Sequence, residues 1–271
     1  MTSPTRAWWS PQRLSVGQAC RWRIGPATVV AERRRHEWRV AHGAGEDALN
    51  DTLVVAESVA PNAVPTSADA VSLRFSFESS PAEIRLEPRL ADRDMVIRPA
   101  DPLTLPAGET TQLYVSTPLW FAVATVQPRH LLAEAACYRP SDTWFGPSPV
   151  EGELCYASRT TGRLELAEMP VRPHRAITPV RIRNRAKDAL VLERIKVPVP
   201  LLPLMAGPRG LWTPRIVLTR TEGSERADVQ IEPKAPEGSD ATERVAEPRQ
   251  KPDASVSLRS FGRWLGLGAP S

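Results

Sequence analysis

Proline is the feature that most constrains how this chain can fold. The sequence contains 28 prolines and only 15 glycines in 271 residues. Proline has no backbone N–H to donate, and its ring clashes with the preceding turn of a helix. Long helices are therefore disfavoured, and short strands joined by turns are expected. A hydrophobic fraction of 41% is nevertheless enough to form a real core, which excludes a wholly disordered chain.

Alternating side chains indicate the strands. Val71, Leu73, Phe75 and Phe77 alternate with polar residues, as in a strand with one buried face. The run 119–126 (LWFAVATV) is continuously apolar but far shorter than the ~20 residues needed to cross a bilayer. Short apolar runs separated by turn residues recur along the chain, which is typical of all-β proteins. We therefore predict an all-β fold, with one extended or two packed β-sandwich-like units.

The predicted division places one β-rich unit at residues 8–117 and a second at residues 118–232. Residues 233–252 contain almost no large apolar side chains, so residues 233–271 are expected to form a disordered tail. Near its end, Leu258, Phe261 and Leu265 have the spacing of a short amphipathic helix. With Arg259, Arg263 and Trp264 they make a candidate partner-binding motif, for a protein or an anionic membrane surface.

Charge is unevenly distributed. Residues 1–40 contain eight arginines and two glutamates, whereas the whole chain has a net charge of only +4. Such a region could attract a polyanion, but Arg33, Arg34 and Arg35 lie between apolar runs and are better explained as a solvated hairpin tip. Nucleic-acid binding is therefore not the expected function.

Motifs for cofactor or metal chemistry are missing from the sequence. There is no phosphate-binding glycine loop and no GxSxG nucleophile motif. The three cysteines and four histidines are scattered, without the spacing of a disulfide framework or zinc site. The first residues lack the apolar core of a signal peptide. We expect a cytoplasmic protein with no cofactor and no metal, for which peripheral contact with a membrane is an open alternative.

The best catalytic candidates are Asp142, Glu153 and His174. The two carboxylates could form an acid–base pair, and the histidine could act as a base near neutral pH. The alternative favoured by the local sequence is structural. Ser141 and Asp142 follow a proline and predict a turn capped by their side-chain oxygens, with Trp144 as its buried anchor and Gly146 at its end.

Several segments resemble an uncharacterised family, domain of unknown function 432. They are residues 140–146 (PSDTWFG), 152–156 (GELCY), 159–160 (RT), 173–179 (PHRAITP) and 211–213 (LWT). The resemblance covers most of residues 8–232 and implies no catalytic role for any residue. It does imply a soluble partner of a membrane protein, because bacterial members of that family often lie near genes for small-conductance mechanosensitive channels.

Taken with the residues, this resemblance favours a non-enzymatic interaction protein, accessory to a mechanosensitive-type membrane channel and bound to it through the C-terminal motif. The alternative is a small-ligand-binding or hydrolytic domain that uses Asp142, Glu153 and His174. The two hypotheses differ in one structural respect. An enzyme would bring those side chains into one pocket, whereas a structural turn would leave Glu153 and His174 apart.

Overall fold

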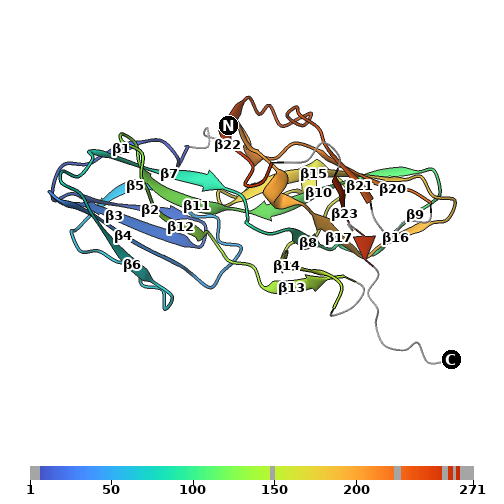
Figure 1. Cartoon of the computed structure of the whole chain (residues 1–271), viewed down its shortest axis with the longest axis horizontal. Coiled ribbons are helices and arrows are strands. Elements are labelled where there is room, and N and C mark those ends of the chain that lie inside the picture. Colours follow the sequence, from blue (N-terminus) through green and yellow to red (C-terminus); the bar gives the residue numbers. More distant parts are fainter. Residues whose placement is uncertain (1–6, 147–149, 223–226, 252–255, 259–260, 263–271) are drawn as a thin grey trace.

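The computed structural model describes residues 7–146, 150–222, 227–251, 256–258 and 261–262. Within them the secondary structure consists of strands and two short 3₁₀ helices, η1 (Leu166–Glu168) and η2 (Val199–Leu201), which confirms the all-β prediction. The molecule is elongated, with two groups of sheets arranged end to end (Figure 1). We call the group nearer the beginning of the sequence the N-terminal half and the other the C-terminal half.

The N-terminal half contains two antiparallel sheets. The five-stranded sheet has the order β5-β2-β3-β4-β6, and the four-stranded sheet has the order β1-β7-β11-β12. They pack face to face, since the His42 ring of β4 lies 5.7 Å from the Phe121 ring of β11. The strands are β1 (Gln12–Arg13), β2 (Ala19–Ile24), β3 (Ala27–Arg33), β4 (Glu37–Ala44), β5 (Leu53–Val59), β6 (Val71–Ser76), β7 (Glu83–Arg89), β11 (Trp120–Thr125) and β12 (Leu131–Ala136).

The C-terminal half contains three sheets. Its eight-stranded sheet has the order β22-β18-β19-β15-β20-β21-β23, with β10 also paired to β15, and its five-stranded sheet has the order β13-β14-β8-β17-β24. The pair β9 and β16 completes it. The strands are β8 (Met95–Ile97), β9 (Leu103–Leu105), β10 (Thr110–Pro118), β13 (Asp142–Phe145), β14 (Glu153–Ala157), β15 (Arg175–Asn184), β16 (Leu190–Leu192), β17 (Arg194–Val197), β18 (Leu204–Gly207), β19 (Gly210–Trp212), β20 (Ile216–Arg220), β21 (Ala227–Ile231), β22 (Glu243–Ala246), β23 (Val256–Leu258) and β24 (Phe261–Gly262).

Strand pairing crosses the predicted boundary at residues 117 and 118 in both directions. Strand β10, before it, pairs along its whole length with β15, while β11, after it, pairs with β7. The chain thus enters the C-terminal half with β8, returns to the N-terminal half with β11 and β12, and leaves it again. The division into two units at that position stays a prediction.

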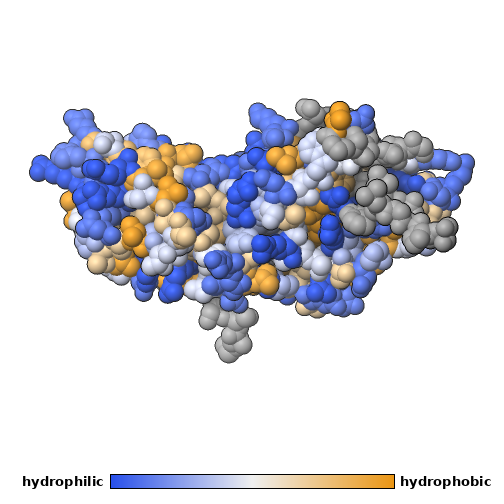
Figure 2. Space-filling model, turned by 90° about the horizontal axis from the view of Figure 1, so that it is seen from below, coloured by the Kyte–Doolittle hydropathy of each residue, from blue (hydrophilic) through white to orange (hydrophobic). Residues whose placement is uncertain are grey.

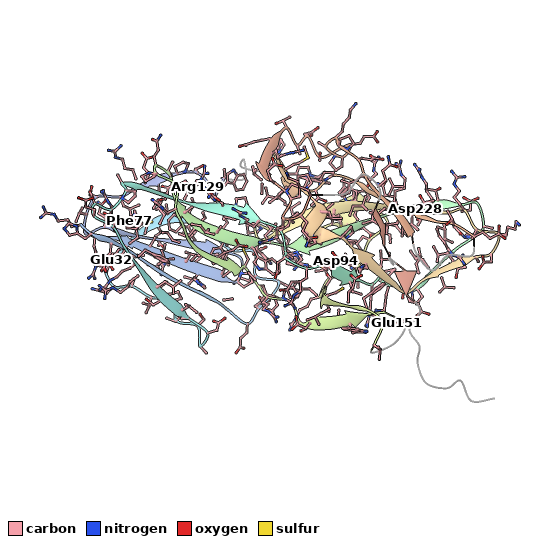
Figure 3. The ribbon with its side chains drawn as sticks, viewed as in Figure 1. Glu32, Phe77, Asp94, Arg129, Glu151 and Asp228 are labelled. Carbon is pink, nitrogen blue, oxygen red and sulfur yellow. The ribbon has the colours of Figure 1, made fainter. Side chains whose placement is uncertain are left out.

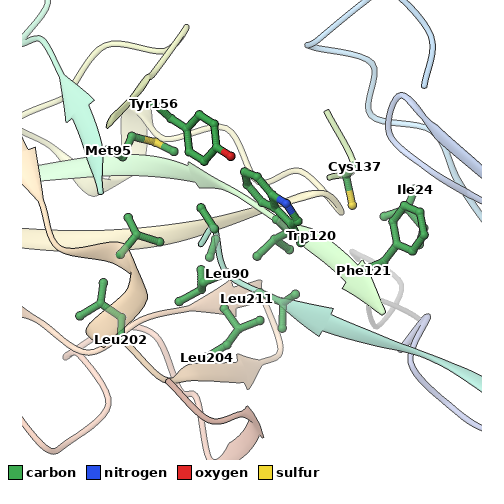
Figure 4. Close-up of a cluster of buried hydrophobic side chains, with 14 of the residues drawn as sticks. Ile24, Leu90, Met95, Trp120, Phe121, Cys137, Tyr156, Leu202, Leu204 and Leu211 are labelled. Carbon is green, nitrogen blue, oxygen red and sulfur yellow. The ribbon is translucent and has the colours of Figure 1, made fainter. Parts of the chain in front are cut away.

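One hydrophobic core runs through both halves. Trp22 and Trp38 of the N-terminal half and Val180 and Ile216 of the C-terminal half belong to the same cluster of buried side chains. Figure 4 shows part of it, with Phe121 at one end, Met95 at the other and Trp120 between them. The continuously apolar run at 119–126 forms β11, in which every residue is buried, as expected for a strand covered on both faces.

Part of the segment predicted to be a disordered tail is ordered. Glu243–Ala246 forms β22, which pairs with β18, and Val256–Leu258 forms β23, which pairs with β21. Phe261–Gly262 forms β24, which pairs with β17. The polar composition of this segment suits strands at sheet edges, where the ladder hydrogen bonds of a partner replace a buried face of their own.

Pro179 shows how an interior strand accommodates a proline. It lies in the middle of β15, a central strand of the eight-stranded sheet. On one side β15 has two successive parallel partners: β19 pairs with Ala176 and Ile177, and β20 pairs from Val180 onward. Pro179 lies in the gap between these partners, where the ladder lacks a strand and a missing N–H donor costs little.

Candidate functional site

The β13–β14 hairpin contains the residues that the sequence analysis singled out most strongly. Its strands pair antiparallel, with Asp142 opposite Tyr156 and Trp144 opposite Leu154. Strand β14 joins the sheet by parallel pairing with β8, which leaves β13 at the sheet edge. The hairpin lies along the lower side of the molecule in Figure 1.

The predicted turn at Ser141, Asp142, Trp144 and Gly146 is corrected by this geometry. Asp142–Phe145 is a strand, because Thr, Trp and Phe favour the extended backbone and β14 supplies the partner. Trp144 is not a buried anchor: it is 41% exposed, and Leu154 opposite it is 48% exposed. Phe145, on the other face of the strand, is the buried residue. The hairpin therefore presents a contiguous apolar pair to its surroundings.

Two glycines allow the hairpin to close. A Cβ added to Gly146 would lie 2.1 Å from the Glu151 carbonyl oxygen, and a Cβ added to Gly152 would lie 2.6 Å from Trp144 Nε1. Neither position has room for a side chain. Arg194, a residue of β17, contacts β13 in two ways. Its Nη2 donates to the Trp144 carbonyl at 2.8 Å, and its guanidinium lies 5.4 Å from the Phe145 ring centre.

Asp142 is held by arginines rather than by a backbone N–H. Arg139 Nη2 donates to both of its carboxylate oxygens, at 2.9 and 3.0 Å, and Arg93 Nη1 donates to Oδ1 at 3.3 Å. Both guanidiniums also lie 5.4 Å from the ring centre of Tyr156, whose hydroxyl donates to Asp92 at 2.9 Å. The carboxylate that was a candidate acid or base thus has a structural role in fixing the start of the hairpin.

Glu153 forms an ion pair with a lysine that the sequence did not single out as a site residue. Lys196 of β17 is fully buried, and its Nζ lies 2.5 Å from Glu153 Oε2 and 3.1 Å from Asp94 Oδ2. Figure 3 shows Asp94 at the junction of the sheets and Glu151 at the far end of the hairpin. Because Lys196 alternates with the apolar Ile195 and Val197, the sequence pattern alone would place it in solvent. Its burial depends on partners from other segments, Asp94 before β8 and Glu153 of β14.

The charges in this cluster perturb one another. Burial raises the pKa of Asp94, and the Lys196 ammonium opposes that effect. Burial alone would lower the pKa of Lys196, but the hydrogen bond to Glu153 and the charge of Asp94 outweigh it, so the lysine stays protonated. Burial also raises the pKa of the nearby Cys155 to about 11, so its thiol is not activated as a nucleophile at neutral pH.

His174 lies apart from Asp142 and Glu153. It is fully buried, its Nε2 lies 3.1 Å from the Ala48 carbonyl oxygen, and its ring abuts Gly25 of the N-terminal half. Burial and the charge of Arg175 lower its pKa to about 4. The structure thus does not bring the three candidate catalytic side chains into one pocket.

The candidate anchors in the C-terminal segment are only partly described. Leu258 ends β23 and Phe261 begins β24, so the backbone at both positions is extended and not helical. Arg259, Arg263, Trp264 and Leu265 lie outside the described residues. Ladder pairing with two different sheets explains why the helical spacing of this segment was misleading.

In the part of the chain that the structure describes, no three His, Cys, Asp or Glu side chains lie together as a potential metal site. No helix in those ranges is long and apolar enough to span a membrane. The cysteines Cys20, Cys137 and Cys155 are all free and buried.

Comparison with protein families gives a match over nearly the whole chain. Residues 8–265 match a family model with the description "Protein of unknown function (DUF432)". No curated protein and no solved structure matches the chain. The match covers nearly the whole chain, including both halves and the hairpin.

Proposed function

The chain belongs to the DUF432 family of proteins of unknown function, and we propose that it is a non-enzymatic interaction protein that binds a protein partner through the β13–β14 hairpin. The observation that supports this most directly is the exposed pair Trp144 and Leu154, directly opposite each other on a strand pair at the edge of a sheet. Tryptophan is enriched among the residues that contribute most to protein interfaces.

The apolar pair differs from ordinary surface residues in its setting. Single exposed apolar side chains are common on proteins and need no explanation. Figure 2 views the molecule from the side on which the hairpin lies and shows hydrophobic patches separated by charged side chains. On the hairpin an indole and a leucine adjoin, and the strands beneath them are held by Lys196 through the Glu153 side chain and by Arg194 through the Trp144 carbonyl. A surface held rigid before binding loses less entropy when a partner docks.

A non-enzymatic role is supported by what the candidate catalytic groups already do. Asp142 is bound to two arginines, Glu153 is bound to Lys196, and His174 is fully buried with its Nε2 3.1 Å from the Ala48 carbonyl oxygen. Each has a structural partner. A reaction at any of them would require breaking contacts that hold the fold together.

The partner class rests on the resemblance noted from the sequence. We propose a mechanosensitive-type membrane channel as the partner, with this protein on the cytoplasmic side and peripheral to the membrane. The C-terminal segment beyond Gly262 is a second candidate contact, because the motif with Arg263, Trp264 and Leu265 lies there. These two contact sites can be separated experimentally.

The test uses the full chain and the small-conductance mechanosensitive channel of the same organism, purified in lipid nanodiscs, with binding measured by biolayer interferometry. The hairpin variant is Trp144→Ala with Leu154→Ala. The matched control is Val71→Ala with Leu131→Ala, which removes apolar side chains of comparable exposure, 43% and 50%, from edge strands of the N-terminal half. A third variant ends at Gly262 and keeps every strand that the structure describes.

We expect the hairpin variant to bind at least about tenfold more weakly, as for a central interface tryptophan, while the control binds as the wild type does. Loss confined to the shortened chain would transfer the contact to the C-terminal segment and contradict the hairpin proposal. Equal binding by all variants would place the interface elsewhere. If the wild type does not bind the channel, the proposed partner is wrong.

A further inference from the structure

A cleft of about 770 Å³ lies between the two halves, far from the hairpin in sequence. Segments from both halves line it: the start of the chain, the residues before β5, the segment before β15, the β18–β19 turn and the residues before β22. Its size is that of a typical small-molecule site. Neither the candidate catalytic residues nor the hairpin contributes to it.

Two tryptophans build one wall of the cleft. Trp8 is buried, and its Nε1 donates to the Pro173 carbonyl at 3.1 Å, which ties the start of the chain to the C-terminal half. The Trp9 ring meets the Trp8 ring edge to face, with centres 5.6 Å apart. Trp9 is thereby held in place and remains half-buried at the cleft. Leu53 and Leu211 add further apolar surface.

The charges at the cleft are unbalanced. Among the described residues that line it, three are acidic, Asp51, Asp240 and Glu243, and one is a cation, Arg172. None of these three carboxylates forms an ion pair with any residue in the described ranges. Arg172 is itself directed to a backbone carbonyl, since its Nε donates to Leu49 at 3.3 Å.

A neighbouring groove shows that this imbalance is specific to the cleft. Trp9 and Glu243 also line a groove of about 370 Å³ between β7 and β22. There the other acids are neutralised: Glu87 pairs with three arginines, and Glu247 lies 3.1 Å from Arg244. Among the described residues around Trp9, the carboxylates without an ion-pair partner are therefore those that line the larger cleft. Apolar walls around them strengthen their field on a bound ligand.

We propose that the cleft binds an organic cation, an amine or guanidinium group carried on an aliphatic stem. The stem would pack on Leu53 and Leu211, the charged group would lie against the Trp9 ring, and the carboxylates would accept its hydrogen bonds. The group can come from a free polyamine or from a basic side chain of a peptide. This site is independent of the hairpin, so either proposal can fail without the other.

The experiment titrates the full chain with spermidine, agmatine and a short arginine-containing peptide, using isothermal calorimetry and tryptophan fluorescence. Butanol serves as an uncharged probe. The cleft variant is Asp240→Asn with Glu243→Gln. The matched control, Glu222→Gln with Asp228→Asn, removes two exposed carboxylates of the same half that lie outside the cleft. All four positions are at the surface, so the variants should keep the melting temperature of the wild type.

We expect at least one cationic probe to bind, with affinity lowered tenfold or more in the cleft variant and by Trp9→Ala, and unchanged in the control. Binding of the free amines identifies a small-molecule source, and binding of the peptide alone identifies a polypeptide source. The proposal is overturned if no cation binds at millimolar concentration, if butanol binds as well as agmatine, or if binding persists in the cleft variant.

Discussion

The Nζ of Lys196 lies 2.5 Å from Oε2 of Glu153, although the lysine is fully buried and the glutamate side chain is 56% exposed. This ion pair connects the inside of the five-stranded sheet to the surface of the hairpin. It links β14 to β17 across β8, which lies between them in the sheet. The apolar surface of the hairpin therefore depends on a charge that is out of reach of solvent.

Lys196→Ala should destabilise the protein by about 3 kcal/mol, because it leaves the Asp94 carboxylate, whose side chain is only 18% exposed, without its counter-charge. The measurement is urea unfolding followed by circular dichroism. Lys187→Ala is the control, since that lysine pairs with Glu222 at the exposed surface and should change stability by less than about 1 kcal/mol. Similar effects of the two substitutions would show that the buried pair is not important for folding.

Gly25→Ala should be among the most damaging single substitutions in the N-terminal half. Gly25 has a φ of +58°, and an added Cβ would lie 2.1 Å from His174 Nδ1. Gly17→Ala separates the cost of the backbone conformation from the cost of the steric clash, because Gly17 has a φ of +88° and no atom within 4 Å of the added Cβ. We expect Gly17→Ala to cost about 1 kcal/mol for the backbone alone and Gly25→Ala clearly more in thermal unfolding. Equal costs would refute the predicted collision.

His174 should make the protein less stable in mild acid. Its folded-state pKa of about 4 is below the ordinary value of 6.5, so the folded state resists protonation. Above pH 6.5 the histidine is neutral in the folded and the unfolded state and has no effect on the pH dependence. As the pH drops from 6.5 toward 4, only the unfolded state gains a proton, so the free energy of unfolding falls by up to about 3 kcal/mol. Comparing urea unfolding of the wild type and His174→Phe across this range isolates the effect. A difference between them that does not change with pH would contradict the assignment.

Arg175 is a buried cation without an acidic partner among the described residues. Its Nε donates to Ser116 Oγ at 2.6 Å, and its Nη2 donates to the Ser116 carbonyl and to Thr160 Oγ1. Burial lowers its pKa to about 10, so it stays charged at neutral pH. Arg175→Lys cannot reproduce these directed hydrogen bonds and should cost about 2 kcal/mol or more. Arg181→Lys on the same strand is the control, and a similar loss in both would show that the geometry at Arg175 is unimportant.

Local patterns were sufficient to predict the fold class. The alternation at Val71–Ser76 and the apolar run of β11 identified strands directly, because the side-chain period of a strand is a property of a few consecutive residues. Leu131–Ala136 (LLAEAA), by contrast, consists of good helix formers and nevertheless forms β12. Its pairing with β11 decided the outcome.

The candidate site could be predicted only in part. The distinctive run around Asp142 and Trp144 was found from the sequence, but its conformation and exposure were not. Whether Trp144 is an anchor or a surface residue depends on which face of the hairpin packs on the sheet. That orientation is set by Arg194 and Lys196, about fifty residues further along the chain.

What the sequence by itself determined was the all-β character and the absence of long helices, because proline and side-chain alternation act through the local backbone. Tertiary structure alone decided which strands are neighbours, that β22, β23 and β24 join the sheets, that Lys196 is buried, and that Trp9 lines a cleft together with three carboxylates. These features depend on segments far apart in the chain. Their free energy comes from complementary partners, which no short stretch of sequence contains.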